Sequence, residues 1–221
     1  LIPHHFDQDQ LETKALLARV LRWYVGLPQR DGVPIVGMVS RLVEQKGFAE
    51  LLSQSDPALV RILSRLRVQV VILGSGAERY QNALIDLAAS FDHLSVTLGF
   101  DNRLAHLIEA ASDFFLMPSR YEPCGLNQMY SLRYGTVPIV TERGGLADTV
   151  TDIRSDEGNG TGYLIPGSTS RAIFQTVSAA FSDLEKRPER VREARIRGME
   201  KRFTWDRSAR DYEAVYAEVL S

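Results

Sequence analysis

Six short apolar segments without polar alternation recur along the chain, and they constrain its fold more than any other feature. They occupy residues 33–39, 68–73, 94–98, 113–117, 136–141 and 163–165. Strands of this kind suit a parallel sheet that is covered on both faces. Helical stretches lie between most of them, so the order predicts an α/β fold, a Rossmann-like doubly wound parallel sheet with right-handed crossovers. Ligands of such sheets bind at the carboxyl ends of the strands.

The segments on either side of these strands predict a three-part organisation. Residues 1–30 read as a linker and a first helix, residues 31–203 as the Rossmann-like domain, and residues 204–221 as a final helix. We expect Asp7 or Asp9 to cap the first helix, and Trp23 and Tyr24 to pack on the core. Because the chain begins at Leu1 without an initiator methionine, we expect it to be an excised domain.

Composition argues against several classes of function. The formal net charge of −2 gives no global basic field that would recruit nucleic acid. No apolar run approaches the roughly 20 residues that a membrane-spanning helix needs. The single cysteine cannot form an internal disulfide, which fits a reducing compartment. The four histidines lack the spacing of metal ligands, so we expect no metal site.

The loop after the first strand carries two cations. It reads Ser40-Arg-Leu-Val-Glu-Gln-Lys-Gly47, and it places Arg41 and Lys46 at the expected binding edge of the sheet. A guanidinium group can bind two oxygens of a diphosphate, while an ammonium group supplies a point charge. The alternative is that both are ordinary surface cations on a loop.

A second candidate site begins at Glu122, just before a short predicted helix over residues 126–134. A carboxylate at this position is stabilised by the helix N-terminus and can accept hydrogen bonds from sugar hydroxyls. The alternative is that Glu122 only caps the helix. Cys124 has no histidine beside it in the motif, so we expect a small, buried and inert thiol.

Two weaker signals follow the second and third strands. Gly74, in the turn Leu73-Gly-Ser-Gly76, would let the backbone approach a nucleotide, although a plain strand-to-helix turn explains it equally well. Phe100, in Gly99-Phe-Asp-Asn102, would pack beside a base, or it would belong to the core as a lone Phe after a strand commonly does.

The stretch from Ser119 to Val150 closely resembles the C-terminal domain of bacterial glycogen synthases and plastid starch synthases, glycosyltransferase family 5. The agreement runs through Glu122-Pro-Cys-Gly-Leu126, Gln128, Tyr130, the Tyr134-Gly-Thr136 turn and Gly144-Gly-Leu-Ala-Asp148. The octapeptide from Ser40 to Gly47 is an independent match to the same family. The resemblance implies the C-terminal half of a GT-B glycosyltransferase. Residues 1–30 would then contain the interdomain linker and first helix, residues 31–203 would form the nucleotide-sugar-binding domain, and residues 204–221 would be the C-terminal crossover helix.

The resemblance also implies roles for residues at matching positions. Arg41, Lys46 and Glu122 would be the catalytic residues, with the two cations on the sugar-nucleotide phosphates and the carboxylate on the donor glucose. The donor-binding residues would be Gly74, Phe100, Cys124, Gly125, Leu126, Asn127, Tyr130, Gly144 and Gly145.

This sequence departs from the family pattern at a few positions. Asn127 stands where many members have Thr, although either side chain can hydrogen-bond a phosphate. Thr141 and Arg143 replace a more basic stretch. Tyr130 occupies a position where many related retaining transferases carry a second Glu; this departure is typical of glycogen synthases.

For the full-length protein, the resemblance implies a hexosyltransferase of glycogen or starch biosynthesis. It would transfer glucose from ADP-glucose to the non-reducing end of an α-1,4-glucan, with retention and without a cofactor. The missing N-terminal GT-B domain would complete the site, so we expect the isolated domain to transfer little or no glucose. The alternatives are a nucleotide-sugar binding module without transfer activity and a related retaining glucosyltransferase that uses UDP-glucose. The location would be cytoplasmic in a bacterium and the plastid stroma in a plant.

Overall fold

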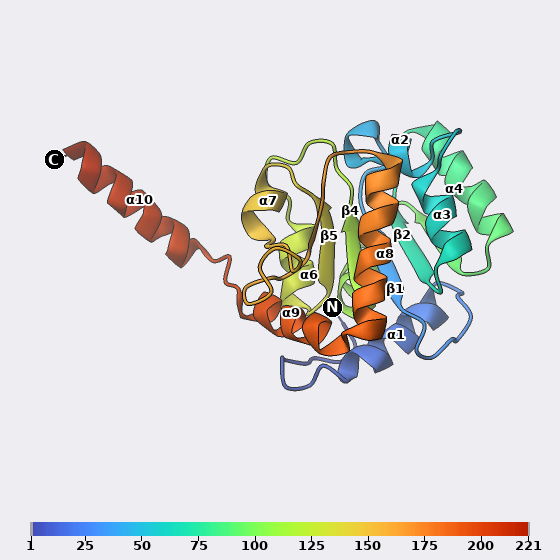
Figure 1. Ribbon diagram of the computed structural model, residues 1–221, viewed down its shortest axis with the longest axis horizontal. Helices are drawn as coiled ribbons and strands as arrows, with labels where there is room; N and C mark the ends of the chain where they lie inside the picture. Colours follow the sequence, from blue (N-terminus) through green and yellow to red (C-terminus); the bar gives the residue numbers. More distant parts are fainter. Residues whose placement is uncertain (1, 221) are drawn as a thin grey trace.

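The computed structural model describes residues 2–220, except for the side chains of Arg207 and Asp211, and it confirms the predicted parallel sheet (Figure 1). The sheet has six strands in the order β3-β2-β1-β4-β5-β6, and every pairing is parallel. The strands are β1 (Ile35–Val39), β2 (Gln69–Gly74), β3 (Leu94–Leu98), β4 (Phe114–Met117), β5 (Val137–Thr141) and β6 (Tyr163–Ile165). The strand order reverses between β1 and β4, which is where doubly wound sheets bind their ligands.

Helices connect the strands and cover both faces of the sheet. They are α1 (Thr13–Tyr24), η1 (Glu44–Lys46, a 3-10 turn), α2 (Phe48–Leu51), α3 (Ala58–Arg65), α4 (Glu78–Ser90), α5 (Asn102–Ala111), α6 (Asn127–Arg133), α7 (Gly145–Thr149), α8 (Ser170–Lys186), α9 (Pro188–Glu200) and α10 (Trp205–Leu220). None of the described helices is both long enough and apolar enough to span a membrane.

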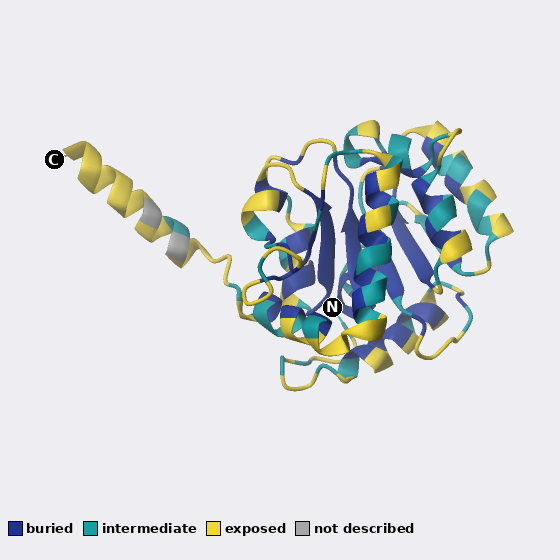
Figure 2. Cartoon of the chain, viewed as in Figure 1, coloured by how far each residue is buried: buried dark blue, intermediate teal, exposed yellow. Residues whose placement is uncertain are grey.

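Neighbouring residues of the central strands pack into two separate hydrophobic cores. Val36 and Phe114 point to the face covered by α3, α8 and α9, whereas Ile35 and Phe115 point to the face covered by α1 and α5. Successive side chains of a strand alternate between faces, so a strand covered on both sides must be apolar throughout. Figure 2 shows the resulting buried sheet between helices whose outer surfaces are exposed.

The first helix differs from its prediction in two respects. α1 buries Leu17 and Leu21 against α5, so Trp23, roughly 200° around the helix from Leu21, faces solvent. The side chains of Trp23 and Tyr24 are exposed, and the prediction that they pack on the core is wrong. The cap prediction is also wrong, because Glu12 occupies the N-cap without a side-chain hydrogen bond, while Asp7 accepts one from the backbone of Asp9.

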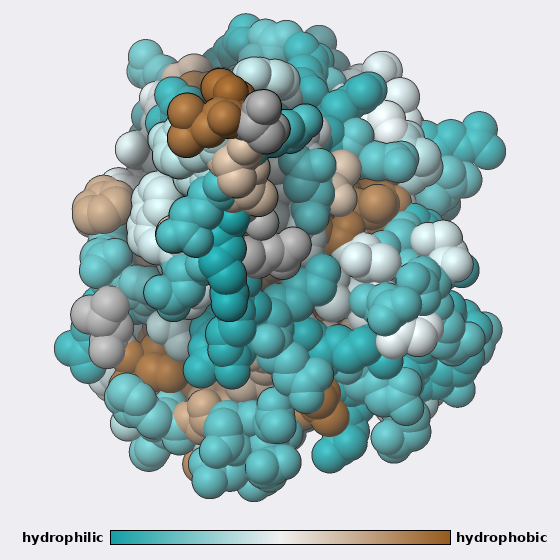
Figure 3. All heavy atoms as spheres, turned by 90° about the vertical axis from the view of Figure 1, so that its left-hand side faces the viewer, coloured by the Kyte–Doolittle hydropathy of each residue, from teal (hydrophilic) through white to brown (hydrophobic). Residues whose placement is uncertain are grey.

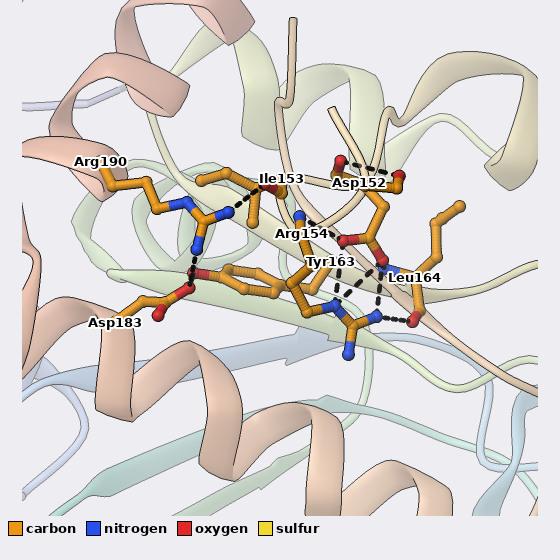
Figure 4. Close-up of polar contacts among 8 residues, drawn as sticks. Asp152, Ile153, Arg154, Tyr163, Leu164, Asp183 and Arg190 are labelled. Carbon is orange, nitrogen blue, oxygen red and sulfur yellow. Dashed lines mark hydrogen bonds and ion pairs between the residues drawn. The ribbon is translucent and has the colours of Figure 1, made fainter. Parts of the chain in front are cut away.

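A buried polar network ties the loop between α7 and β6 to the last two body helices (Figure 4). Asp183 of α8 accepts hydrogen bonds from the hydroxyl of Tyr163 at 3.0 Å and from Arg190 of α9 at 3.3 Å. On the other side of the loop, Arg154 pairs with Asp152. Burial alone would raise the pKa of Asp152, but hydrogen bonds from Arg154 and from the Leu164 amide outweigh it and lower the pKa. These charges are paired in their buried setting and fix the edge of the sheet at β6.

The last helix, α10, projects away from the body (Figure 1). It exposes Trp205, Tyr212, Val215, Tyr216 and Val219. Figure 3, in which this helix lies in front, shows hydrophobic side chains on it above a largely hydrophilic surface. Such exposed apolar side chains on one element are typical of a surface that another structure covers.

Candidate functional site

Two loops that follow neighbouring strands enclose a cavity at the edge of the sheet. β1 ends at Val39 and leads into the loop 40–47, while β4 ends at Met117 and leads into the loop 118–126. Together they line a cavity of about 360 Å³ at the carboxyl ends of the two strands. This is the edge at which the sheet topology predicts a ligand.

Lys46 and Glu122 meet inside this cavity. The ammonium group of Lys46 donates a hydrogen bond to Glu122 Oε2, and the hydroxyl of Ser119 donates to the same oxygen at 3.3 Å. The side chains of Lys46 and Glu122 are 18% and 9% exposed. Glu122 therefore pairs with a cation on the opposite loop, and it does not cap α6, whose N-cap is Leu126.

Arg41 lines the same cavity and leaves its charge available. Its side chain is exposed, and within residues 2–220 it has no hydrogen-bond or ion-pair partner. A guanidinium group in this state can bind an anion without first breaking an internal contact. The cavity thus combines one unpaired cation with one cation that shares a carboxylate.

A second, smaller cavity of about 230 Å³ adjoins the first, and Ser40, Arg41 and Asn127 line both. Its remaining walls include Leu73, Gly74 and Phe100. Phe100 is 90% exposed, so the alternative that it belongs to the core is excluded. A flat aromatic side chain at the rim of a mostly apolar hollow suits a heterocyclic base.

Gly74 is required by the way the two strand ends approach one another. A Cβ atom at this position would lie 1.9 Å from the carbonyl oxygen of Ser40. No side chain fits at that distance, so this glycine allows the loop that carries Arg41 to pack on the end of β2.

Asn127 fixes the start of α6 to the end of β1. Its Nδ2 donates a hydrogen bond to the carbonyl oxygen of Val39 at 2.7 Å. The side-chain amide is therefore already bound to protein at one end, and its Oδ1 is the atom left for a ligand. Gly125, with a φ of +74°, and the half-exposed Leu126 line the cavity just before it.

Gly144 and Gly145 pack against the backbone of the loop 118–126. A Cβ atom on Gly144 would lie 2.3 Å from the carbonyl oxygen of Glu122, and the amide of Gly145 donates to that oxygen at 3.1 Å. Cys124 lies beside Gly145 and is exposed, so the prediction of a buried thiol is wrong. Cys124 lies between Pro123 and Gly125 in the loop 118–126, and this position keeps its thiol out of both hydrophobic cores.

Comparison with known proteins gives the family. Residues 25–197 match the model of the glycosyl transferases group 1. The chain belongs to this family. The predicted fold, the C-terminal half of a GT-B glycosyltransferase, is confirmed by this match and by solved structures. The Anabaena protein HepE, solved in complex with UDP-glucose, shares the fold with a TM-score of 0.65 at 18% identity over 90% of this chain and 50% of its own.

Within the glycosyl transferases group 1, the chain is similar to glycogen and starch synthases. It is 42% identical to a glycogen synthase of Treponema denticola over 99% of its length and 47% identical to one of Anaeromyxobacter dehalogenans over 97%. Among solved structures, the catalytic domain of starch synthase IV from Arabidopsis thaliana, bound to ADP and acarbose, gives a TM-score of 0.86 at 33% identity over 98% of this chain. The resemblance stated from the motifs is confirmed.

The chain spans less than half the length of these relatives, 45% of the first and 44% of the second, and 45% of the starch synthase chain. The similarity therefore extends over only part of those proteins.

The residues selected from the sequence fall into two groups, those that line the two cavities and those that do not. Most of the residues selected from the sequence line one or both cavities, namely Arg41, Lys46, Gly74, Phe100, Glu122, Gly125, Leu126 and Asn127. Among the described lining residues, neither cavity includes Cys124, Tyr130, Gly144 or Gly145. Tyr130 lies on α6 with its ring 5.8 Å from that of His106, so a donor-binding role for it stays a prediction.

Sequence reasoning missed the residues that shape the loop around Glu122. Ser119 is 1% exposed and donates to the Glu122 carboxylate, while Thr141 Oγ1 donates to the Ser119 carbonyl at 2.5 Å. This contact also shows why Thr141 needs no positive charge, because its side chain is buried and holds the loop. The available signal was the position of Ser119 at the start of the matching stretch.

Proposed function

We propose that this chain is the ADP-glucose-binding part of a retaining glycogen or starch synthase, which transfers glucose to the non-reducing end of an α-1,4-glucan. The observation that carries the proposal is the convergence of Arg41, Lys46 and Glu122 on one cavity, beside a mostly apolar hollow rimmed by Phe100. The similarity to glycogen synthases over nearly the whole chain supports it.

In this proposal the diphosphate of the donor lies against Arg41 and Lys46. Negative charge builds on the departing ADP as the glycosidic bond to the donor glucose breaks, and two fixed cations stabilise it most at that stage. Glu122 accepts hydrogen bonds from hydroxyl groups of the glucose and so fixes its orientation. The amides around Gly125 and Leu126 add donors at the same wall of the cavity.

The base of the nucleotide occupies the second cavity. Phe100 covers one side of it, while Gly74 keeps the opposite wall free of a side chain. A purine offers a larger apolar face than a pyrimidine, so adenine gains more from this hollow than uracil.

The glucan acceptor and the remaining catalytic groups belong to another part of the longer protein. Transfer needs groups on both sides of the donor and exclusion of water, so this chain alone binds nucleotide and transfers little or no glucose. The exposed apolar side chains of α10 are proposed to pack on that missing part as the crossover helix. A bacterial protein of this kind would act in the cytoplasm, and a plant protein in the plastid stroma.

A calorimetric titration tests the proposal. The purified chain is titrated with ADP and with UDP, beside the double variant Arg41→Ala/Lys46→Ala. We expect ADP binding that the double variant loses, and weaker binding of UDP. Preference for UDP would move the chain to a related glucosyltransferase. Binding of ADP-glucose by the longer protein without glucan elongation would indicate a binding module instead.

A further inference from the structure

The loop that carries Lys46 also carries a carboxylate two residues earlier. Glu44 begins the η1 turn that ends at Lys46. A free carboxylate there would weaken the attraction of the loop for a diphosphate. The structure turns this carboxylate toward Arg120, whose Nη1 donates to Glu44 Oε1, and toward Arg79, whose Nη2 lies 3.5 Å from Glu44 Oε2.

Arg120 joins the two loops of the site at several points. Its Nε donates to Glu50 Oε1 at 2.6 Å, and its backbone amide donates to the carbonyl oxygen of Gln45 at 2.8 Å. The side chain of Gln45 returns a bond, because its Nε2 donates to the carbonyl oxygen of Tyr121 at 3.1 Å. The loop 118–126 is thereby attached to the loop 40–47 and to the first turn of α2.

The loops 40–47 and 118–126 also approach each other closely beside these contacts of Arg120. A Cβ atom on Gly47 would be 2.2 Å from the carbonyl oxygen of Pro118. Among the described residues that line the two cavities, none is Glu44, Glu50 or Arg120. The attachment therefore lines neither cavity, and it acts on a ligand through the positions of Lys46 and Glu122 and through its charges.

Arg120 is an ion-pair partner of two carboxylates, those of Glu44 and Glu50. The side chain of Glu50 is 12% exposed, and its second carboxylate oxygen is buried without a hydrogen-bond partner in the described structure. The hydrogen bond to Glu50, followed by the interaction with Glu44, raises the pKa of Arg120. Without Arg120, Glu50 would have no cationic partner among the described residues, where Glu44 would keep only Arg79, 3.5 Å away.

We propose that Arg120 is a positioning residue for the donor diphosphate, and this role rests on the proposed function. It holds the loops of Lys46 and Glu122 in register and offsets part of the negative charge of Glu44 and Glu50, so that these carboxylates weaken the field of Arg41 and Lys46 at the ligand less. Both effects concern the charged part of the nucleotide and leave the base cavity untouched.

The variant Arg120→Gln tests this role by titration with ADP and with adenosine. We expect ADP to bind about tenfold more weakly, corresponding to roughly 1.4 kcal/mol, while adenosine binding stays unchanged because adenosine carries no phosphate. Because the side chain of Glu50 is only 12% exposed, the variant should lose some stability, so its thermal unfolding is measured beside the titration to establish that it is folded. The matched control is Arg19→Gln on α1, which removes the exposed ion pair with Asp31 and should bind ADP normally.

A second variant separates the two effects. In Glu44→Gln/Arg120→Gln the carboxylate disappears together with its partner, so ADP affinity should recover in part if neutralisation matters. Arg120→Lys restores the charge but not the paired geometry, and it should bind ADP better than Arg120→Gln. A double variant as weak as the single one, with no gain from Arg120→Lys, would overturn the electrostatic part of the role.

Other outcomes bear on different statements. Normal ADP binding by Arg120→Gln would overturn the role of Arg120 alone, and equal loss of ADP and adenosine would overturn it as a general disruption of the site. Absence of ADP binding by the unaltered chain would count against the proposed function and, with it, against this role. Wild-type binding that only Arg41→Ala/Lys46→Ala loses would leave the proposed function standing without Arg120.

Discussion

Lys46 donates a hydrogen bond to Glu122 from the opposite side of the cavity, although the two residues are 76 positions apart in the chain. The pair joins the loop after β1 to the loop after β4 at the point where the strand order reverses. In the proposed function the ammonium group also faces the diphosphate and the carboxylate also faces the sugar. Each partner therefore exchanges part of an internal contact for a contact with the donor.

Arg41 and Lys46 should be separable by their effects on stability. We expect Arg41→Ala and Lys46→Ala each to weaken ADP binding roughly ten- to hundredfold, because a charge-assisted hydrogen bond contributes about 1.5–3 kcal/mol. Lys46→Ala also leaves the mostly buried Glu122 without its cation and should cost roughly 1–3 kcal/mol of unfolding free energy. Arg41→Ala should not, which thermal and urea unfolding would check. Equal destabilisation by both variants would contradict the geometry described here.

Glu122→Gln should separate nucleotide binding from sugar transfer. The change removes a negative charge beside the proposed diphosphate and releases Lys46, so ADP should bind as well as before or several-fold more tightly. Transfer to glucan by the longer protein should fall sharply, because the amide no longer accepts hydrogen bonds at both positions. Calorimetry and a glucan elongation assay measure the two effects. Glu142→Gln, at an exposed carboxylate after β5, is the control with the same charge change. Weaker ADP binding by Glu122→Gln would argue against the shared use of Lys46.

Gly74→Ala should damage both folding and nucleotide binding for a steric reason. The added methyl group would fall 1.9 Å from the Ser40 carbonyl oxygen, so the loop that bears Arg41 must move. We expect a loss of about 1–3 kcal/mol in unfolding free energy, as for other overpacked sites, and a measurable loss of ADP affinity. Gly158→Ala, where the nearest atom to an added Cβ would be 3.7 Å away, lies at an exposed position outside both cavities and should change neither quantity. An unaffected Gly74→Ala variant would show that the close approach is dispensable.

Glu109 gives the fold a pH dependence. Burial raises its pKa to about 8, and its Oε2 lies 3.2 Å from Nδ1 of His106, whose own pKa is lowered by burial. The side chain of a glutamate in an unfolded chain has a pKa of about 4.3. Between these values the folded state holds a proton that the unfolded state has lost, so stability falls as pH rises toward 8.

The variant Glu109→Gln removes this titration. It should raise the melting temperature at pH 8 and change it little at pH 5, since glutamine resembles the protonated acid. Glu189→Gln, at an exposed position on α9, should show no such difference between the two values of pH. A stability gain at pH 5 equal to that at pH 8 would exclude the titration of Glu109 as the cause.

The sheet could be predicted from the sequence because its strands are buried on both faces. Residues such as Val36 and Ile35 enter different cores, so the pattern of each strand is a short continuous apolar run that is easily recognised. The first helix shows the limit of this reasoning. Several of its apolar residues could form the buried stripe, and only packing against α5 decides that Leu17 and Leu21 are inside and Trp23 is outside.

The site could be predicted where its residues follow strands and match family motifs. Arg41, Lys46 and Glu122 fall into this class. The contacts of Arg120 with Glu44 and Glu50 could not be predicted, because they join residues about 70 or more positions apart and no local pattern marks an ion pair between two loops. The exposure of Cys124 was missed for a related reason, since small thiols are commonly buried and only the path of the loop brings this one out.

The proposed catalytic residues share one property with Arg120, which is that none of them belongs to either hydrophobic core as described. The strands β1 and β4 end at Val39 and Met117, and Arg41, Lys46 and Glu122 all lie in the loops beyond those points. Mutations in these loops can therefore change which donor is bound while the sheet still folds. A protein of this architecture can acquire new donor specificities in evolution without losing its folded state on the way.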